Sequence, residues 1–222
     1  MTLTFLDLYN ECAGQPWSMY DNDVESSEEF ETAMRISINK AVSYLWNLYP
    51  WKFRLNNVKI KTKPNKTKYV LPDGTIAKKT IVGTKKHCIR YEGDYLEYAP
   101  NYTVLEEEFG EPKEFYVDGD DLYIYPTPDD VYVLSIDYFS APIGIKEDGT
   151  EIYELVDDTD QLNIPEKYET YFKNAVISKA MLYAITDQSD ENDSGYREQF
   201  ADALNVLRTY CYDDVKERKI II

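Results

Sequence analysis

The sequence predicts an α+β protein in which an antiparallel β domain is inserted into a bundle of helices. Apolar residues recur every three or four positions before Pro50 and again after Asn163, and every second position between them. A chain of 222 residues is also long enough for two small domains. We expect an N-terminal helical part (1–50), an inserted β domain (51–145), and C-terminal helices with an extended tail (146–222), with 1–50 and 163–218 forming one bundle.

The N-terminal part begins with a short amphipathic stretch, which is followed by Gly14, Pro16 and an acidic run. A helix is predicted to begin at Ser26, because Ser26 and Glu29 have the spacing of a capping box. The apolar residues that follow lie on one helical face until Pro50 stops the run. They are Phe30, Ala33, Met34, Ile38, Ala41, Leu45 and Leu48.

The middle of the chain has the period of half-buried strands. Val58 and Ile60 alternate with polar residues, and Leu71-Pro72-Asp73-Gly74 is typical of a turn. Asp118-Gly119 stands between two alternating apolar runs and predicts a β-hairpin. A longer strand is predicted from Val131 to Phe139.

Helices return after Asn163, a candidate N-cap before Pro165 and Glu166. This helix is predicted to run to about Ile185 and, being apolar on most sides, to be the central one. Asp187 to Gly195 is predicted to be an acidic loop. A final helix carries one apolar face, formed by Tyr196, Phe200, Ala203, Leu204, Leu207 and Cys211.

The composition indicates a globular protein. Hydrophobic residues make up 43% of the chain, and the formal net charge is −17. Cys12, Cys88 and Cys211 are scattered, which argues against a disulfide framework or a structural zinc site. We find no secretory leader and no apolar run long enough for a membrane span, so we expect a protein made inside the cell without a membrane partner.

Positive charge is concentrated in one segment. Residues 52–90 hold twelve Lys or Arg residues and one acid, Asp73, a net charge of +11, whereas the remaining residues sum to −28. Three interpretations are open: ion pairing with an acidic neighbouring copy, a solvated face, or a nucleic-acid groove in which Tyr69 or Tyr91 stacks on bases. For the subunit or ring contact we expect Lys59, Lys61, Lys63, Lys66, Lys68, Lys78, Lys79, Lys85, Lys86 and Arg90.

Residues that could carry chemistry are few. His87 is the one histidine, and its neighbour Cys88 would point to the opposite face of a strand. Asp190–Gly195 matches the first half of a calcium-binding loop, but its twelfth position, where a bidentate Glu is required, is Ala201. No glycine-rich phosphate-binding motif is present. We therefore expect no catalytic residue, no cofactor, no metal site and no enzymatic activity.

The order of the motifs resembles a known family. Asn39-Lys40, Trp51-Lys52-Phe53 and Leu71-Pro72-Asp73 follow one another as in the head-to-tail adaptor (connector ring) proteins of short-tailed phages, of the tail tubular protein A type. Leu122–Pro126, Tyr138–Pro142 and Ile164-Pro165-Glu166 continue the series, so the resemblance covers most of residues 28–212. The basic insert and the acidic 147–160 loop depart from the family pattern.

The resemblance implies a structural virion protein of the head–tail junction in a podovirus, made in the host cytoplasm. About twelve copies would form a ring that binds the portal and the next tail or ring protein. DNA would pass through the lumen during ejection without specific binding, since a ring of such copies carries on the order of −200 charges and an acidic wall does not hold a polyanion. The alternative is a nucleic-acid-binding module that uses the basic β segment 52–90.

The C-terminal tail is a second candidate contact. An apolar end that follows a charged run is suited to dock in a groove or add a strand to a partner, and a frayed end is the other interpretation. For docking to the portal or another partner we expect Lys219, Ile220, Ile221 and Ile222.

Overall fold

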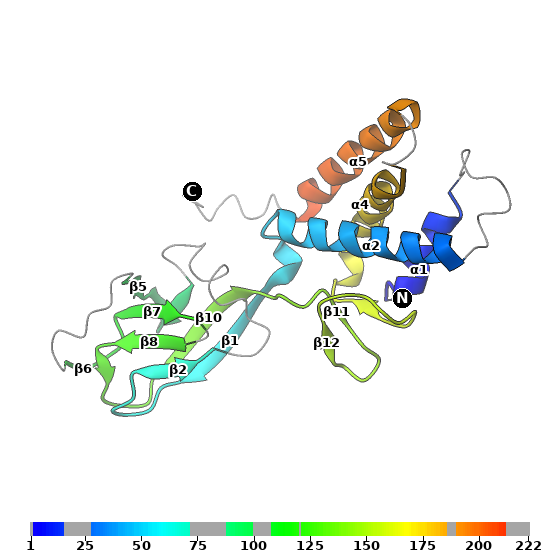
Figure 1. Ribbon diagram of the computed structural model, residues 1–222. Helices are drawn as coiled ribbons and strands as arrows, with labels where there is room; N and C mark the ends of the chain where they lie inside the picture. Colours follow the sequence, from blue (N-terminus) through cyan, green and yellow to red (C-terminus); the bar gives the residue numbers. More distant parts are fainter. Residues whose placement is uncertain are drawn as a thin grey trace. The chain divides into compact units, whose positions relative to one another are not determined.

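The computed structural model describes residues 2–15, 28–71, 88–99, 108–119, 121–185 and 190–211. Over these residues the chain is α+β, as predicted (Figure 1). It divides into two compact units. The helical unit comprises residues up to Phe53 and from Pro142 to the end of the last helix, and the β unit comprises Arg54–Ala141. The helices are α1 (Phe5–Ala13), α2 (Glu28–Leu48), α4 (Glu166–Ile185) and α5 (Asp190–Cys211), with a 3-10 turn, η1, at Lys52–Arg54.

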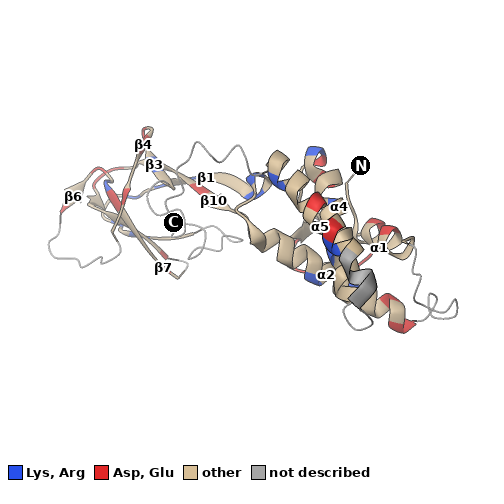
Figure 2. Ribbon diagram, turned by 90° about the horizontal axis from the view of Figure 1, so that it is seen from above, with Lys and Arg blue, Asp and Glu red and all other residues tan. Residues whose placement is uncertain are grey.

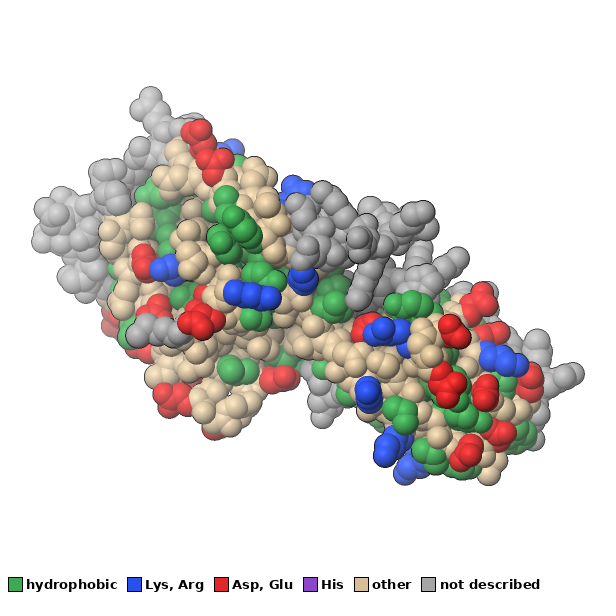
Figure 3. Space-filling model, turned by 180° about the vertical axis from the view of Figure 1, so that it is seen from behind, with side chains coloured by type: hydrophobic (Ala, Val, Ile, Leu, Met, Phe, Trp, Pro, Cys, Tyr) green, Lys and Arg blue, Asp and Glu red, His purple; other side chains and the backbone are tan. Residues whose placement is uncertain are grey.

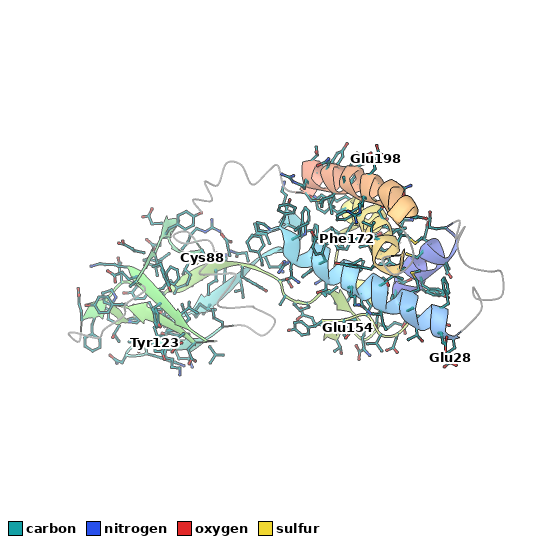
Figure 4. The ribbon with its side chains drawn as sticks, turned by 45° about the horizontal axis from the view of Figure 1, so that its top comes forward. Glu28, Cys88, Tyr123, Glu154, Phe172 and Glu198 are labelled. Carbon is teal, nitrogen blue, oxygen red and sulfur yellow. The ribbon has the colours of Figure 1, made fainter. Side chains whose placement is uncertain are left out.

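Helix α4 is the central element of the helical unit, as its apolar composition predicts. It packs against α1, α2 and α5. The Phe172 side chain is fully buried and lies edge-on to the rings of Trp46 and Phe53, at centroid distances of 6.3 and 5.7 Å (Figure 4). These buried aromatic rings are part of the apolar core that stabilises this unit.

Helix α2 carries the predicted apolar face, and most of that face is buried. Ala33 is the exception, because it is exposed rather than part of the core. The predicted capping residue, Ser26, lies outside the described residues. After the helix ends, the indole Nε1 of Trp51 donates a hydrogen bond to the backbone oxygen of Leu45, which fixes the exit toward the β unit.

The amphipathic N-terminal stretch forms α1, which begins with a complete capping box. The hydroxyl of Thr4 accepts from the backbone N–H of Asp7 at 3.1 Å, and the Asp7 carboxylate accepts from the backbone N–H of Thr4 at 2.9 Å. Phe5, Leu8 and Cys12 are buried against the other helices.

Helix α5 corrects one prediction. Asp190–Gly195, predicted as part of an acidic loop, forms the first turns of α5 instead. The same residues therefore cannot be the opening of a calcium-binding loop, which requires a non-helical turn around the ion. The apolar face of the helix is as predicted, with Leu207 and Cys211 buried.

The β unit contains two four-stranded sheets, ordered β1-β10-β3-β4 and β2-β8-β7-β5, and a short pair, β6-β9. A small sheet, β12-β11-β13, belongs to the helical unit. The strands are β1 (Leu55–Lys61), β2 (Lys68–Val70), β3 (Ile89–Tyr91), β4 (Asp94–Tyr95), β5 (Glu97–Tyr98), β6 (Phe109–Gly110), β7 (Glu114–Asp118), β8 (Asp121–Tyr125), β9 (Thr127–Pro128), β10 (Val133–Phe139), β11 (Gly144–Ile145), β12 (Glu151–Ile152) and β13 (Gln161–Leu162).

The predicted hairpin is confirmed, and the strand predicted from Val131 to Phe139 forms β10, which begins at Val133. β7 and β8 pair as a hairpin in which Asp118 is opposite Asp121, and Gly119 has the positive φ, 64°, that such a turn requires. On β10, Leu134 and Ile136 are fully buried in the β core. The predicted turn after Leu71 lies outside the described residues.

Candidate subunit interface

One surface of the β unit combines exposed apolar groups with positive charge that no described residue pairs. Side chains alternate along β1, so Val58 and Ile60 pack on the β core while Lys59 and Lys61 lie on the outer face. On β10, Val133 is directly opposite Lys61 and is 45% exposed. Through the register of β10, β3 and β4, Tyr95, 42% exposed, shares this face. We call Lys59, Lys61, Val133 and Tyr95 the basic sheet face.

Arg90 lies on the same face but its charge is already paired. Its Nη2 donates to both carboxylate oxygens of Asp137, at 2.8 and 3.0 Å, and its guanidinium lies over the ring of Tyr95 at 5.6 Å. Asp137 is largely covered, with a side chain 10% exposed. We conclude that Arg90 holds the sheet together as well as lining its surface.

Lys68 is also paired within the chain. It stands on β2, in the other sheet, and its Nζ lies 2.8 Å from a carboxylate oxygen of Asp121. The hydrogen bond with Asp121 raises the pKa of Lys68. The structure thus separates Lys68 from Lys59 and Lys61.

Lys63 and Lys66 lie in the loop between β1 and β2, where Tyr69 fixes the backbone. The Tyr69 hydroxyl accepts from the backbone N–H of Lys63 at 3.0 Å and donates to the backbone oxygen of Lys66 at 2.6 Å. Tyr69 is only 8% exposed, in the β core. The idea that Tyr69 stacks on a nucleic-acid base is therefore wrong, because its ring faces the protein interior.

Several predicted contact residues lie outside the described residues. They are Lys78, Lys79, Lys85, Lys86, Lys219, Ile220, Ile221 and Ile222, and His87 belongs with them.

Part of the acidic counterpart of the basic segment lies in the β unit itself. Residues 92–141 carry fourteen Asp or Glu residues and one Lys, Lys113. Figure 3 shows basic side chains gathered along one border of the β unit and acidic side chains over the neighbouring area. The charge separation is thus in part internal to the β unit. Among the described residues, Lys68 pairs directly with Asp121 and Arg90 with Asp137.

With this geometry established, the comparison with known protein families is decisive. The family model described as SU10 adaptor protein matches residues 4–218, nearly the whole chain. The chain belongs to the SU10 adaptor protein family. It is a structural phage adaptor and a virion component, which confirms the resemblance to phage head-to-tail adaptors. Such an adaptor associates with other virion components such as the portal and tail. No curated protein matches the chain.

In this adaptor the acidic 147–160 segment is a firmly anchored loop. The Asn39 side chain donates to the backbone oxygen of Leu155 at 2.8 Å and accepts from the backbone N–H of Leu155 at 3.0 Å, as a neighbouring strand would. The buried carboxylate of Asp160 accepts from the backbone N–H groups of Val156 and Asp157. We call residues 146–160 the anchored loop. The sequence drew attention to Asn39 only through the family resemblance, since a single Asn in a helix gives no sign of its distant partner.

Between its anchors the loop presents apolar side chains to solvent. Tyr153 is 61% and Val156 is 66% exposed, while Leu155 between them is buried. Tyr153 and Glu154 line a groove together with Ile36, Lys40 and Tyr44 of α2. Figure 4 shows Glu154 on this loop, outside the helices that enclose Phe172. Exposed apolar side chains on a rigid support are typical of a contact surface.

Arg35 ties the anchored loop to α1 and α2. Its guanidinium forms ion pairs with Glu31 and with Asp158 of the loop, and it lies over the rings of Phe5 and Tyr9 at 4.9 and 5.3 Å. Sequence patterns did not reveal the contact between Arg35 and Asp158, because these two residues are 123 positions apart.

Among the described residues, no group of three His, Cys, Asp or Glu side chains is placed to hold a metal ion. Burial raises the pKa of Cys12, Cys88 and Cys211 to about 12, which keeps these thiols protonated and unreactive at neutral pH. The described helices include none with the length and apolarity of a membrane span. The family is structural and is not known for an enzymatic activity.

Proposed function

We propose that this adaptor forms an oligomeric ring of about twelve copies that joins the phage portal to the tail and passes DNA through its lumen. The observation that carries the proposal is the family match over residues 4–218. The proposed site of action is the head–tail junction of a podovirus particle, and the chain reaches it after synthesis in the host cytoplasm.

The charge of the chain supports passage of DNA without binding. Each copy carries −17, and Figure 2 shows acidic residues on the ribbons of both units. A ring with an acidic lumen repels the phosphate backbone, so that DNA slides through it without being held.

A nucleic-acid-binding module is the second candidate, favoured by the exposed side chains of Lys59, Lys61, Lys63 and Lys66. Two observations count against it. Lys68 and Arg90 are neutralised by carboxylates, and Tyr69 is buried. A groove for single-stranded nucleic acid uses free cations together with exposed aromatic rings, so Lys59, Lys61 and the exposed Tyr95 of the basic sheet face would have to supply both. Salt-sensitive DNA binding by the purified full-length chain would support this candidate over the ring.

The ring proposal is tested by assembly with the portal protein of the same phage. Native mass spectrometry of the mixed proteins is expected to give a complex with many copies of this chain per portal ring. A chain that never binds portal, alone or assembled, would contradict the proposal.

The C-terminal tail remains part of the proposal as a portal contact. Deleting Lys219, Ile220, Ile221 and Ile222 is expected to weaken portal attachment without unfolding the protein, as checked by circular dichroism. Unchanged attachment would show that the tail has no such role.

A further inference from the structure

The anchored loop offers negative charge that nothing in the described part of the chain neutralises. Glu147, Glu151 and Glu154 are exposed and form no ion pair with any described residue. They flank the exposed Tyr153, and Val156 lies close by in sequence. The carboxylates of Asp157 and Asp158, by contrast, are engaged by Lys146 and Arg35.

The basic sheet face offers the opposite charge together with exposed apolar groups. Lys59 and Lys61 form no ion pair with the residues that the structure describes. Val133 lies directly opposite Lys61, and Tyr95 is exposed on the same face at the other edge of the sheet. Both surfaces are held in place before binding, one by strand pairing and one by Asn39, Asp160 and Arg35. Contact between them would therefore cost little ordering entropy.

We propose that the basic sheet face of one copy binds the anchored loop of the next copy, and this inference rests on the proposed ring. Lys59 and Lys61 meet Glu151 and Glu154, while Val133 and the exposed Tyr153 and Val156 add apolar contact beside these charges. Charge complementarity fixes the register, and the apolar contact excludes water from the charges. A second copy is the occupant because the same chain carries both halves of the match.

The two surfaces are different, so the contact is heterologous. Each copy uses one surface toward the preceding copy and the other toward the following copy. A heterologous contact can be repeated from copy to copy, and it forms a ring when its rotation closes, whereas a self-matching surface stops at a dimer. The inference thus names the contact between neighbouring copies in the proposed ring.

Charge reversal tests this contact between copies. Lys59→Glu with Lys61→Glu makes both surfaces of a copy acidic, and Glu151→Lys with Glu154→Lys makes both basic. Each double variant alone is expected to need at least about tenfold more protein for half-maximal assembly, because every contact becomes repulsive. An equimolar mixture of the two is expected to regain assembly, since alternating copies present opposite charges at every contact.

The control for the loop variant reverses two exposed acids of α5, Glu198→Lys with Asp202→Lys. It raises the net charge as much as Glu151→Lys with Glu154→Lys does, but outside the loop. Sedimentation velocity at several salt concentrations measures assembly, and circular dichroism confirms that each variant is folded. Assembly of the control is expected to match that of the unmodified chain. The wild-type contact is expected to weaken as salt rises.

The inference and the ring proposal fail in different ways. If the unmodified chain assembles, or forms its ring on the portal, and the reversed variants do so equally well, this contact is refuted while the ring stands. The same holds if both double variants lose assembly but their mixture does not regain it. If the unmodified chain neither self-associates nor binds portal, the ring itself is refuted and the contact with it.

Discussion

Replacing Asn39 by alanine tests whether the anchored loop depends on one side chain of α2. The substitution removes both hydrogen bonds to the backbone of Leu155 and leaves a part-buried N–H and C=O without these partners. Two such bonds contribute about 2 kcal/mol together. Alanine is the better helix former by up to about 0.7 kcal/mol, so the expected net loss is about 1.5 kcal/mol. For a unit of this size that corresponds to a fall of roughly 3–6 °C in Tm.

The assay combines thermal unfolding with hydrogen exchange. Asn47→Ala is the matched control, because it makes the same change on the same helix at an exposed position that does not line the groove beside the loop. In Asn39→Ala we expect faster exchange of the Leu155 amide, by about tenfold for each 1.4 kcal/mol of local stability lost. Equal Tm and equal exchange in the two variants would refute the idea that Asn39 holds the loop. Loss of loop order is also expected to weaken assembly through the contact inferred above.

Three further predictions concern the core, the thiols and the sheet. Phe172→Ala is expected to lower the free energy of unfolding in urea by about 3–5 kcal/mol, because it leaves a cavity beside Trp46 and Phe53. A loss below about 1 kcal/mol would contradict the central place of α4. The pKa of each cysteine is raised from 9.0 to about 12. The thiols are therefore expected to resist a thiol reagent at pH 8 until urea is added, and rapid reaction of the folded chain would be the contrary result. Each thiol has a higher pKa in the folded chain than in the unfolded chain. The free energy of unfolding is therefore expected to keep its full thiol contribution below about pH 9 and to lose it progressively as the pH rises toward 12. Arg90→Met is expected to destabilise the β unit by about 1–3 kcal/mol, because it removes the ion-pair partner of Asp137. The control Lys113→Met, at an exposed position, is expected to cost less than about 0.5 kcal/mol. Equal effects of the two substitutions would show that the ion pair does not stabilise the fold.

The sequence predicts those features that depend on neighbouring residues. The face of α2, the hairpin at Asp118-Gly119 and the buried α4 follow from periodicity and turn chemistry, which act over a few residues. Asp190–Gly195 was mispredicted as a loop, because its acidic, glycine-containing composition resembles a connection although it forms the first turns of α5.

The candidate interface was only partly accessible from the sequence. Alternation along β1 places Lys59 and Lys61 on an outer face, but the pairing of Arg90 with Asp137 depends on the register of β3 against β10. The burial of Tyr69 likewise follows from the packing of two sheets. Asn39 and Leu155 are 116 residues apart, and no local pattern joins them.

The most direct test of the ring adaptor is lysine cross-linking with mass spectrometry on purified phage particles. The account predicts that the chain is present in particles, with links from Lys59 or Lys61 of one copy to a second copy, and links from other lysines to the portal. Absence of the chain from particles, or its presence without links to the portal or to another copy, would contradict it.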